Sequence, residues 1–126
     1  MGLNYAAKTV LVAEDYEDSR MLLKHKLEML GYRVLEAADG YEAVECATEH
    51  HPDLILMDMA MPFMDGLDAA RYIKEGEKTS DVPIICLTAH TNSYAQKAMH
   101  AGCDMVISKP IDLNNLKPII SMFLDV

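Results

Sequence analysis

The chain has little positive charge for its size. Its 126 residues carry 11 Lys and Arg against 20 Asp and Glu, which gives a formal net charge of -9. Binding to nucleic acid needs clustered Lys and Arg, and attachment to an anionic membrane surface needs them too. We therefore expect no nucleic acid and no membrane among its partners.

Cysteines and long apolar runs are also scarce. The three cysteines, Cys46, Cys86 and Cys103, are an odd number without CxxC spacing, which is typical of small buried side chains in a reducing compartment. No apolar run is long enough to cross a bilayer, and the N-terminus lacks the layout of a signal peptide. The sequence thus predicts a soluble cytoplasmic protein.

Linkers, repeats and low-complexity tracts are absent as well. The length is that of one ordinary domain, and 51% hydrophobic residues suffice for a core. Residues 1–7 show no clear period and are interpreted as an N-terminal tail. We interpret residues 8–126 as one domain.

The domain contains a regular alternation of apolar runs and helical patterns. The predicted strands cover 9–13, 33–37, 53–58, 84–88 and 105–108, and the predicted helices cover about 18–30, 41–51, 67–75, 94–101 and 113–124. Such alternation indicates an α/β fold with a doubly wound, five-stranded parallel sheet and helices on both faces.

Pro118 conflicts with a helix that begins at Leu113. A proline in a helix interior costs about 3 kcal/mol, whereas one in the first turn costs little. We therefore predict a late start for this helix, with a 3₁₀ turn over residues 112–115.

Polar side chains lie at the ends of four predicted strands. Glu14 and Asp15 follow the first strand, Asp58 ends the third, Thr88 ends the fourth and Lys109 follows the fifth. The carboxyl ends of parallel strands meet at one edge of a sheet, where ligands bind. We therefore expect these five side chains to form one site.

The chemistry of this set points to phosphoryl transfer. Three clustered carboxylates repel one another unless a cation lies between them, and Mg²⁺ is the cation that suits such oxygen ligands. Lys109 adds a charge suited to phosphate, and Thr88 adds a hydroxyl donor. The hypothesis is that Asp58 acts as the nucleophile and forms an aspartyl phosphate.

The same residues resemble the receiver domain of two-component response regulators. The matching motifs are Glu14-Asp15, the stretch from Leu56 to Gly66 around Asp58, Thr88-Ala89 and Lys109-Pro110. The resemblance extends over residues 8–126. It implies a flavodoxin-like strand order 2-1-3-4-5 with five helices, a cis peptide before Pro110, and similarity to single-domain regulators of chemotaxis or the cell cycle.

The resemblance also implies a role for each residue. Asp58 would accept a phosphoryl group from a phosphohistidine of a sensor histidine kinase or a histidine phosphotransfer protein. Mg²⁺ would be held directly by Asp15, Asp58 and the backbone carbonyl of Ala60, and through water by Glu14. Thr88, Ala89 and Lys109 would bind the phosphate. The protein would then be a phosphorylation-activated switch that promotes its own phosphotransfer and dephosphorylation, and not a metabolic enzyme.

The resemblance implies that the protein signals by contact with a downstream protein through the fourth helix, fifth strand and fifth helix. This face includes Tyr94, Gln96, Lys97, His100 and Asn114-Asn115.

Val106 departs from the family, which usually has an aromatic residue at this position. A ring cannot then report the movement of Thr88, so we predict that switching relies on Thr88 and the loop 89–93. His90 could orient a water at the phosphate, whereas Ala60 could not.

Three other functions fit parts of the pattern. An aspartate-nucleophile phosphatase usually has a second Asp where Ala60 stands, and a flavin carrier would not place Glu14-Asp15 against a phosphate. A receiver-like scaffold without phosphorylation would not need the full set of acids, Thr88 and Lys109. His50-His51 lies near Cys46, but no third ligand has metal-site spacing.

Overall fold

The computed structural model describes residues 7–89 and 91–124, and of residues 91–94 it describes the backbone alone. The strands are β1 (Thr9–Ala13), β2 (Arg33–Ala37), β3 (Leu54–Asp58), β4 (Ile84–Thr88) and β5 (Met105–Ser108). The helices are α1 (Glu17–Met29), α2 (Gly40–His50), α3 (Gly66–Glu75), α4 (Thr91–His100) and α5 (Leu116–Leu124), and a 3₁₀ turn, η1 (Leu113–Asn115), precedes α5.

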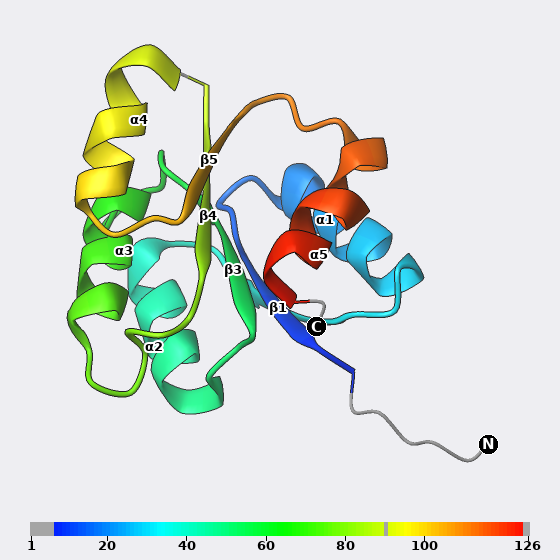
Figure 1. Cartoon of the computed structure of the whole chain (residues 1–126), viewed down its shortest axis with the longest axis horizontal. Coiled ribbons are helices and arrows are strands. Elements are labelled where there is room, and N and C mark those ends of the chain that lie inside the picture. The colour runs from blue at the N-terminus through cyan, green and yellow to red at the C-terminus, as the bar shows by residue number, and fades with distance from the viewer. Residues whose placement is uncertain (1–6, 90, 125–126) are drawn as a thin grey trace.

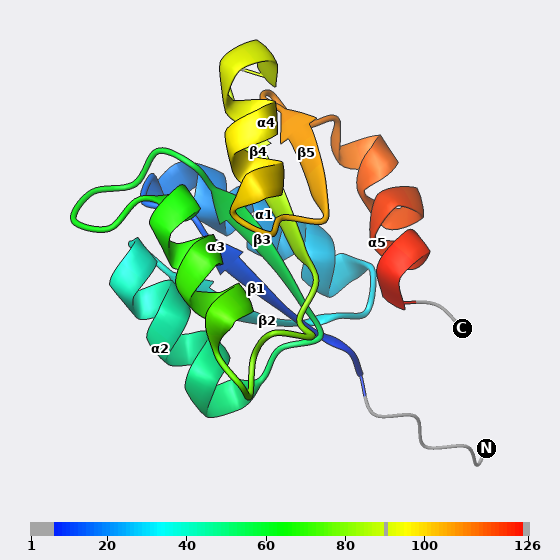
Figure 2. The same ribbon diagram turned by 60° about the vertical axis from the view of Figure 1, so that its left-hand side comes forward.

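The strands form one parallel sheet in the order β2-β1-β3-β4-β5, which confirms the predicted α/β fold and strand order. Helices α1 and α5 cover one face, and α2, α3 and α4 cover the other (Figures 1 and 2). Every residue of β3 and β4 is buried, as expected for central strands between two helical layers.

The side chains on the two faces of β3 pack into separate hydrophobic cores. Ile55 and Met57 pack with the α2, α3 and α4 side, whereas Leu54 and Leu56 pack with the α1 and α5 side. This alternation follows from the two-residue period of a strand. It leaves Asp58 as the last residue of a strand that is otherwise fully apolar.

Two aspartates fix the register of the sheet at its amino edge. Asp53 precedes β3, donates its N–H to the Thr9 carbonyl at 2.8 Å and accepts the Thr9 N–H on Oδ2 at 2.8 Å. Asp104 precedes β5 and exchanges the same two bonds with Ile84, each at 2.8 Å. Each pair aligns two neighbouring strands, and thereby sets which residues meet at the opposite, carboxyl edge.

The proline at the start of the last helix behaves as predicted. The 3₁₀ turn covers Leu113–Asn115, and Pro118 falls in the first turn of α5. Asp112 caps the turn by accepting the Asn114 N–H on Oδ1 at 3.0 Å. The peptide between Lys109 and Pro110 is cis, as the resemblance implied.

Helix α1 begins without a side-chain cap, and α4 begins earlier than predicted. The N-cap of α1 is Tyr16, and its side chain makes no cap bond. Glu17 and Asp18 lie in the first turn instead, where negative charge favours a helix N-terminus. Helix α4 begins at Thr91 rather than Tyr94, because the apolar period begins later than the backbone turn does.

The expectation of three separate thiols is wrong for two of them. Cys86 and Cys103 form a disulfide, and Cys46 is free. The two cysteines lie 17 positions apart in sequence, and the β4–β5 alignment together with the turn after α4 brings them together. Within the part of the chain that the structure describes, no helix combines the length and apolar composition needed to cross a membrane.

The Asp53 pair is testable through stability. Asp53→Ala removes the acceptor of the Thr9 N–H, and we expect the free energy of unfolding to fall by about 1 kcal/mol in urea denaturation. Glu77→Ala changes an exposed acid on the loop before β4 and serves as the control. Equal stability of the two variants would show that Asp53 does not fix the strand pair.

Candidate functional site

Two buried carboxylates lie at the carboxyl edge of the sheet. Asp58 ends β3 with 3% of its surface exposed, and Glu14 follows β1 with 2% exposed. Ionised carboxylates are almost never so buried unless a cation or hydrogen-bond donors compensate the lost hydration. The groups that surround these two carboxylates therefore determine the chemistry of this edge of the sheet.

Lys109 supplies that cation. Its Nζ lies 3.0 Å from Oε1 of Glu14 and 3.1 Å from Oδ2 of Asp58. The backbone N–H of Lys109 donates to the Thr88 carbonyl at 2.9 Å, which anchors the lysine to β4. The side chain thus extends from the β4–β5 side of the sheet toward β3 and β1, and one ammonium compensates the charge of both carboxylates.

The pKa of Lys109 is raised by this arrangement. Burial alone would lower it, but the hydrogen bond to Glu14 and the charge of Asp58 outweigh that effect. The folded protein therefore holds the lysine proton more tightly than the unfolded chain does. The stabilisation is complete below the ordinary pKa of 10.5 and is lost as the pH rises through the higher folded-state value.

The backbone around Asp58 is held on both sides. The Met59 N–H donates to the Leu87 carbonyl at 3.0 Å, so the β3–β4 ladder continues past Asp58. The Gly66 N–H donates to the Met59 carbonyl at 3.0 Å, and a Cβ at Gly66 would overlap the carbonyl oxygen of Asp58. A glycine is therefore needed where α3 begins.

Glu14, Asp15 and Asp58 could hold a metal ion. Each offers a carboxylate oxygen, and these oxygens lie within 4.8 Å of one another. Asp15 is exposed, whereas the other two are buried, so the cluster opens to solvent on the Asp15 side. Hard carboxylate oxygens suit Mg²⁺ or Ca²⁺ better than soft transition metals. The donor set therefore fits the cation that the sequence predicted.

Comparisons with known proteins decide the family. A family model described as the response regulator receiver domain matches residues 10–121. The chain belongs to the response regulator receiver family. Receiver domains are phosphoryl-accepting signalling switches of two-component systems, and they interact with histidine kinases or phosphotransfer proteins.

Individual relatives agree in length as well as in fold. The polar-differentiation response regulator DivK of Brucella ovis is 35% identical over 118 residues, which cover 93% of this chain and 96% of that protein. The receiver domain of a Pseudomonas aeruginosa sensor histidine kinase, solved with a magnesium ion in its active site cleft, is 34% identical with a TM-score of 0.89. The match covers 96% of this chain and 100% of that one. A chemotaxis protein of Vibrio cholerae has the same TM-score at 29% identity, over 94% and 100% of the two chains.

The structure also locates the other residues predicted for this receiver domain, apart from His90. The Ala60 N–H donates to Oδ1 of Asp58 at 3.3 Å. Thr88 is buried at the end of β4, and Ala89 follows it on the surface. Val106 is half-buried, pairs with Cys86 across the sheet and packs on the α2, α3 and α4 side. His90 lies outside the described residues, as do the side chains of residues 91–94.

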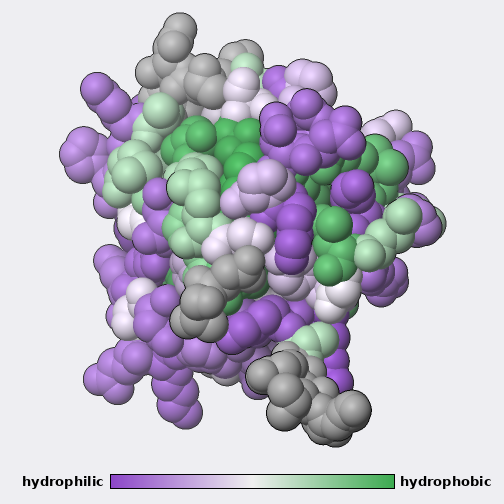
Figure 3. Space-filling view, turned by 45° about the vertical axis from the view of Figure 1, so that its right-hand side comes forward, coloured by the Kyte–Doolittle hydropathy of each residue, from purple (hydrophilic) through white to green (hydrophobic). Residues whose placement is uncertain are grey.

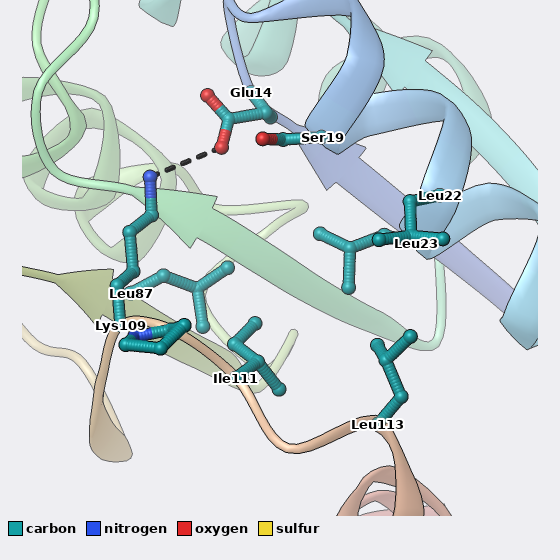
Figure 4. A pocket seen from close by; sticks show the side chains of 9 residues that line it. Glu14, Ser19, Leu22, Leu23, Leu87, Lys109, Ile111 and Leu113 are labelled. Carbon is teal, nitrogen blue, oxygen red and sulfur yellow. Dashed lines mark hydrogen bonds and ion pairs between the residues drawn. The ribbon is translucent and has the colours of Figure 1, made fainter.

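A hollow of about 360 Å³ opens beside the charged group that Glu14, Asp58 and Lys109 form. Hydrophobic side chains gather over the α1 and α5 side of the molecule (Figure 3). Figure 4 shows Leu23, Leu87 and Ile111 pointing into one space, with Glu14 and Lys109 at one end of it. The rest of the lining comes from Ser19, Leu22, Pro110 and Leu113.

The sequence did not predict this hollow or the hydrogen bonds that hold Glu14. Arg20 donates from Nη1 to the Glu14 carbonyl at 2.9 Å, and Tyr16 donates its N–H to Oε2 of Glu14 at 3.2 Å. The helical period predicts Leu22 and Leu23 to be core residues. The hollow that they line forms only where α1 packs beside residues 109–113. Nε2 of His51 lies 3.0 Å from Oδ1 of Asp81.

Removal of the Lys109 charge should destabilise the fold. In Lys109→Met, Glu14 and Asp58 stay buried without a cation, and we expect the free energy of unfolding at neutral pH, with chelator present, to fall by about 2 kcal/mol or more. Lys109→Arg keeps the charge and should lose less. If Lys109→Met unfolds at the same urea concentration as the wild type, the pairs at 3.0 and 3.1 Å contribute nothing to stability.

Proposed function

We propose that this receiver domain is a phosphorylation-activated switch in which Asp58 accepts a phosphoryl group from a phosphohistidine of a sensor histidine kinase or a histidine phosphotransfer protein. The observation that carries the proposal is the buried Asp58 carboxylate, held at the sheet edge between Lys109 and the Glu14-Asp15 pair. We take the receiver domain to be residues 8–126, after a tail of residues 1–7, and to act in the cytoplasm.

The proposed transfer forms one bond and breaks one. A carboxylate oxygen of Asp58 attacks the phosphorus, and the bond from phosphorus to the histidine nitrogen breaks, which returns its electron pair to the imidazole. Lys109 is already within hydrogen-bond distance of Asp58, so its ammonium is placed to neutralise a phosphoryl oxygen. Thr88, on the adjacent strand, would bind another oxygen through its hydroxyl, together with the backbone of Ala89.

Mg²⁺ would be held by Asp15, Asp58 and the carbonyl of Ala60, with Glu14 acting through water. When bound, it supplies positive charge to the phosphoryl oxygens. Both oxygens of Glu14 already have partners, Lys109 on Oε1 and the Tyr16 N–H on Oε2, which favours an indirect role for this residue. The magnesium ion in the cleft of the Pseudomonas relative supports the same choice of metal.

We propose that the signal leaves through the α4-β5-α5 face by contact with a downstream protein. Phosphate would add about 1.5 to 2 negative charges beside Lys109 and Thr88. Val106 offers no ring to move inward, so the proposed relay is Thr88 and the loop 89–93 that leads into α4. Gln96, Lys97, Met99 and His100 are exposed on that helix, and Asn114-Asn115 are exposed before α5.

We propose that the phosphodonor protein docks over the hollow between α1 and residues 109–113. Glu14 and Lys109 line its inner end, so a helix seated there would reach the charged group without crossing another element. Leu22 is 56% exposed at its rim, where a docked partner would bury it.

Phosphorylation itself can be measured without a partner. We expect incubation with acetyl phosphate or phosphoramidate and Mg²⁺ to add the mass of one phosphate to the intact protein. Asp58→Asn and addition of chelator should each abolish the gain, because the first removes the nucleophile and the second removes the cation. Asp68→Asn, an exposed acid on α3, is the control and should accept phosphate normally. A modified Asp58→Asn variant would contradict the assignment of Asp58.

Docking can be separated from chemistry by the choice of donor. We expect Leu22→Ala to slow phosphorylation by a histidine phosphotransfer protein about tenfold, because an interface anchor is lost. Phosphorylation of the same variant by acetyl phosphate should be unchanged. Met29→Ala alters a 70% exposed side chain at the other end of α1 and is the matched control. Equal loss with both donors would mean that Leu22 supports the site rather than the partner.

A further inference from the structure

The disulfide between Cys86 and Cys103 encloses an entire functional segment. Cys86 lies in β4, two residues before Thr88, and Cys103 lies just before β5. The two cysteines lie 17 positions apart in sequence, and the segment between them contains the end of β4, the loop after it and all of α4. The bond therefore ties the C-terminal end of α4 to the strand that carries Thr88.

Apolar packing is sparse over residues 95–100, the part of α4 whose side chains the structure describes. Among residues 95–100 of α4, Ala98 alone is fully buried, while Gln96, Lys97, Met99 and His100 are exposed. An alanine removes little apolar area from water, and its contribution to docking is correspondingly small. A covalent bond next to the helix end is therefore a strong constraint relative to the packing beside it.

The two cysteines are aligned by contacts that do not need the sulfur bond. The Cys103 N–H donates to the Ala98 carbonyl and the Gly102 N–H to the Met99 carbonyl, each at 3.0 Å, which ends α4 in a Schellman motif with Gly102 at φ 103°. Asp104 exchanges two bonds with Ile84. The Cα atoms of the cysteines lie 6.4 Å apart, within the usual disulfide range.

We propose that Cys86 and Cys103 are a reversible redox pair whose oxidation clamps the end of α4 to β4. In the reaction, one cysteine thiolate attacks a low-molecular-weight disulfide such as glutathione disulfide and releases one glutathione. The second cysteine displaces the other glutathione and closes the protein disulfide. The two cysteine thiols are oxidised, and their two protons pass to the two glutathione thiols that leave.

Burial makes the exchange dependent on local opening. Cys86 is 0% exposed and Cys103 is 3% exposed, so glutathione reaches neither sulfur while α4 is docked. In the cytoplasm, where we propose that this protein acts, disulfides are usually transient or redox-sensing, which favours a reversible bond over a structural one. The consequence for signalling rests on the proposed function, because α4 belongs to the face that we propose for output.

The redox step is tested by mass. The protein is equilibrated in buffers that range from reduced glutathione to glutathione disulfide, then denatured and alkylated. We expect three alkylated cysteines on the reduced side and one, Cys46, on the oxidised side. Cys46→Ser should retain the transition, and Cys86→Ala should lose it. No transition at any ratio, or a bond that reduced glutathione does not reopen in the native protein, would overturn the proposal.

The clamp is tested by amide hydrogen exchange of the wild type, so no variant has to fold. We expect exchange in α4 to be slower by about tenfold or more in the oxidised protein, with α2 unchanged as the internal control. Equal exchange in the two states would overturn the clamp. The same measurements on Asp58→Asn should give the same result, so that a failure of the phosphorylation proposal does not affect this one.

Discussion

One ammonium between two buried carboxylates organises the functional end of this protein. Lys109 compensates Glu14 and Asp58, which lie on different strands and would otherwise repel each other. The lysine can reach both because the parallel sheet brings the ends of β1, β3 and β5 to one edge. The same contact offsets the cost of burying Asp58, the residue that we propose as the phosphoacceptor.

The sheet that supports this contact could be predicted closely from the sequence. The runs at 9–13, 33–37, 84–88 and 105–108 coincide with strands. The signal is clearest for the inner strands β1 and β4, because a parallel sheet covered on both faces requires continuous apolar segments there. Once the strands were in order, the positions of Glu14, Asp58 and Lys109 followed from the geometry of parallel sheets. The effect of Pro118 could be predicted as well, because it depends only on the missing N–H of this residue. The 3₁₀ turn ends at Asn115, and α5 begins at Leu116, which leaves Pro118 in its first turn.

Features that depend on distant side chains could not be predicted. The hollow beside Lys109 exists only because α1 and residues 109–113 dock with a gap between them. The Cys86–Cys103 pair depends on the β4–β5 register and on the turn after α4, neither of which leaves a mark in cysteine spacing.

Val106 and the disulfide together constrain how this receiver domain can transmit a signal. Val106 is the strand partner of Cys86, so this side chain lies beside the crosslink. Without a ring to swing inward, the proposed relay from Thr88 has to pass through the loop and α4. That helix has one fully buried side chain among residues 95–100, which permits movement, and one covalent tie at its end, which opposes it. In the proposed mechanism, phosphate and redox state therefore act on the same helix from its opposite ends.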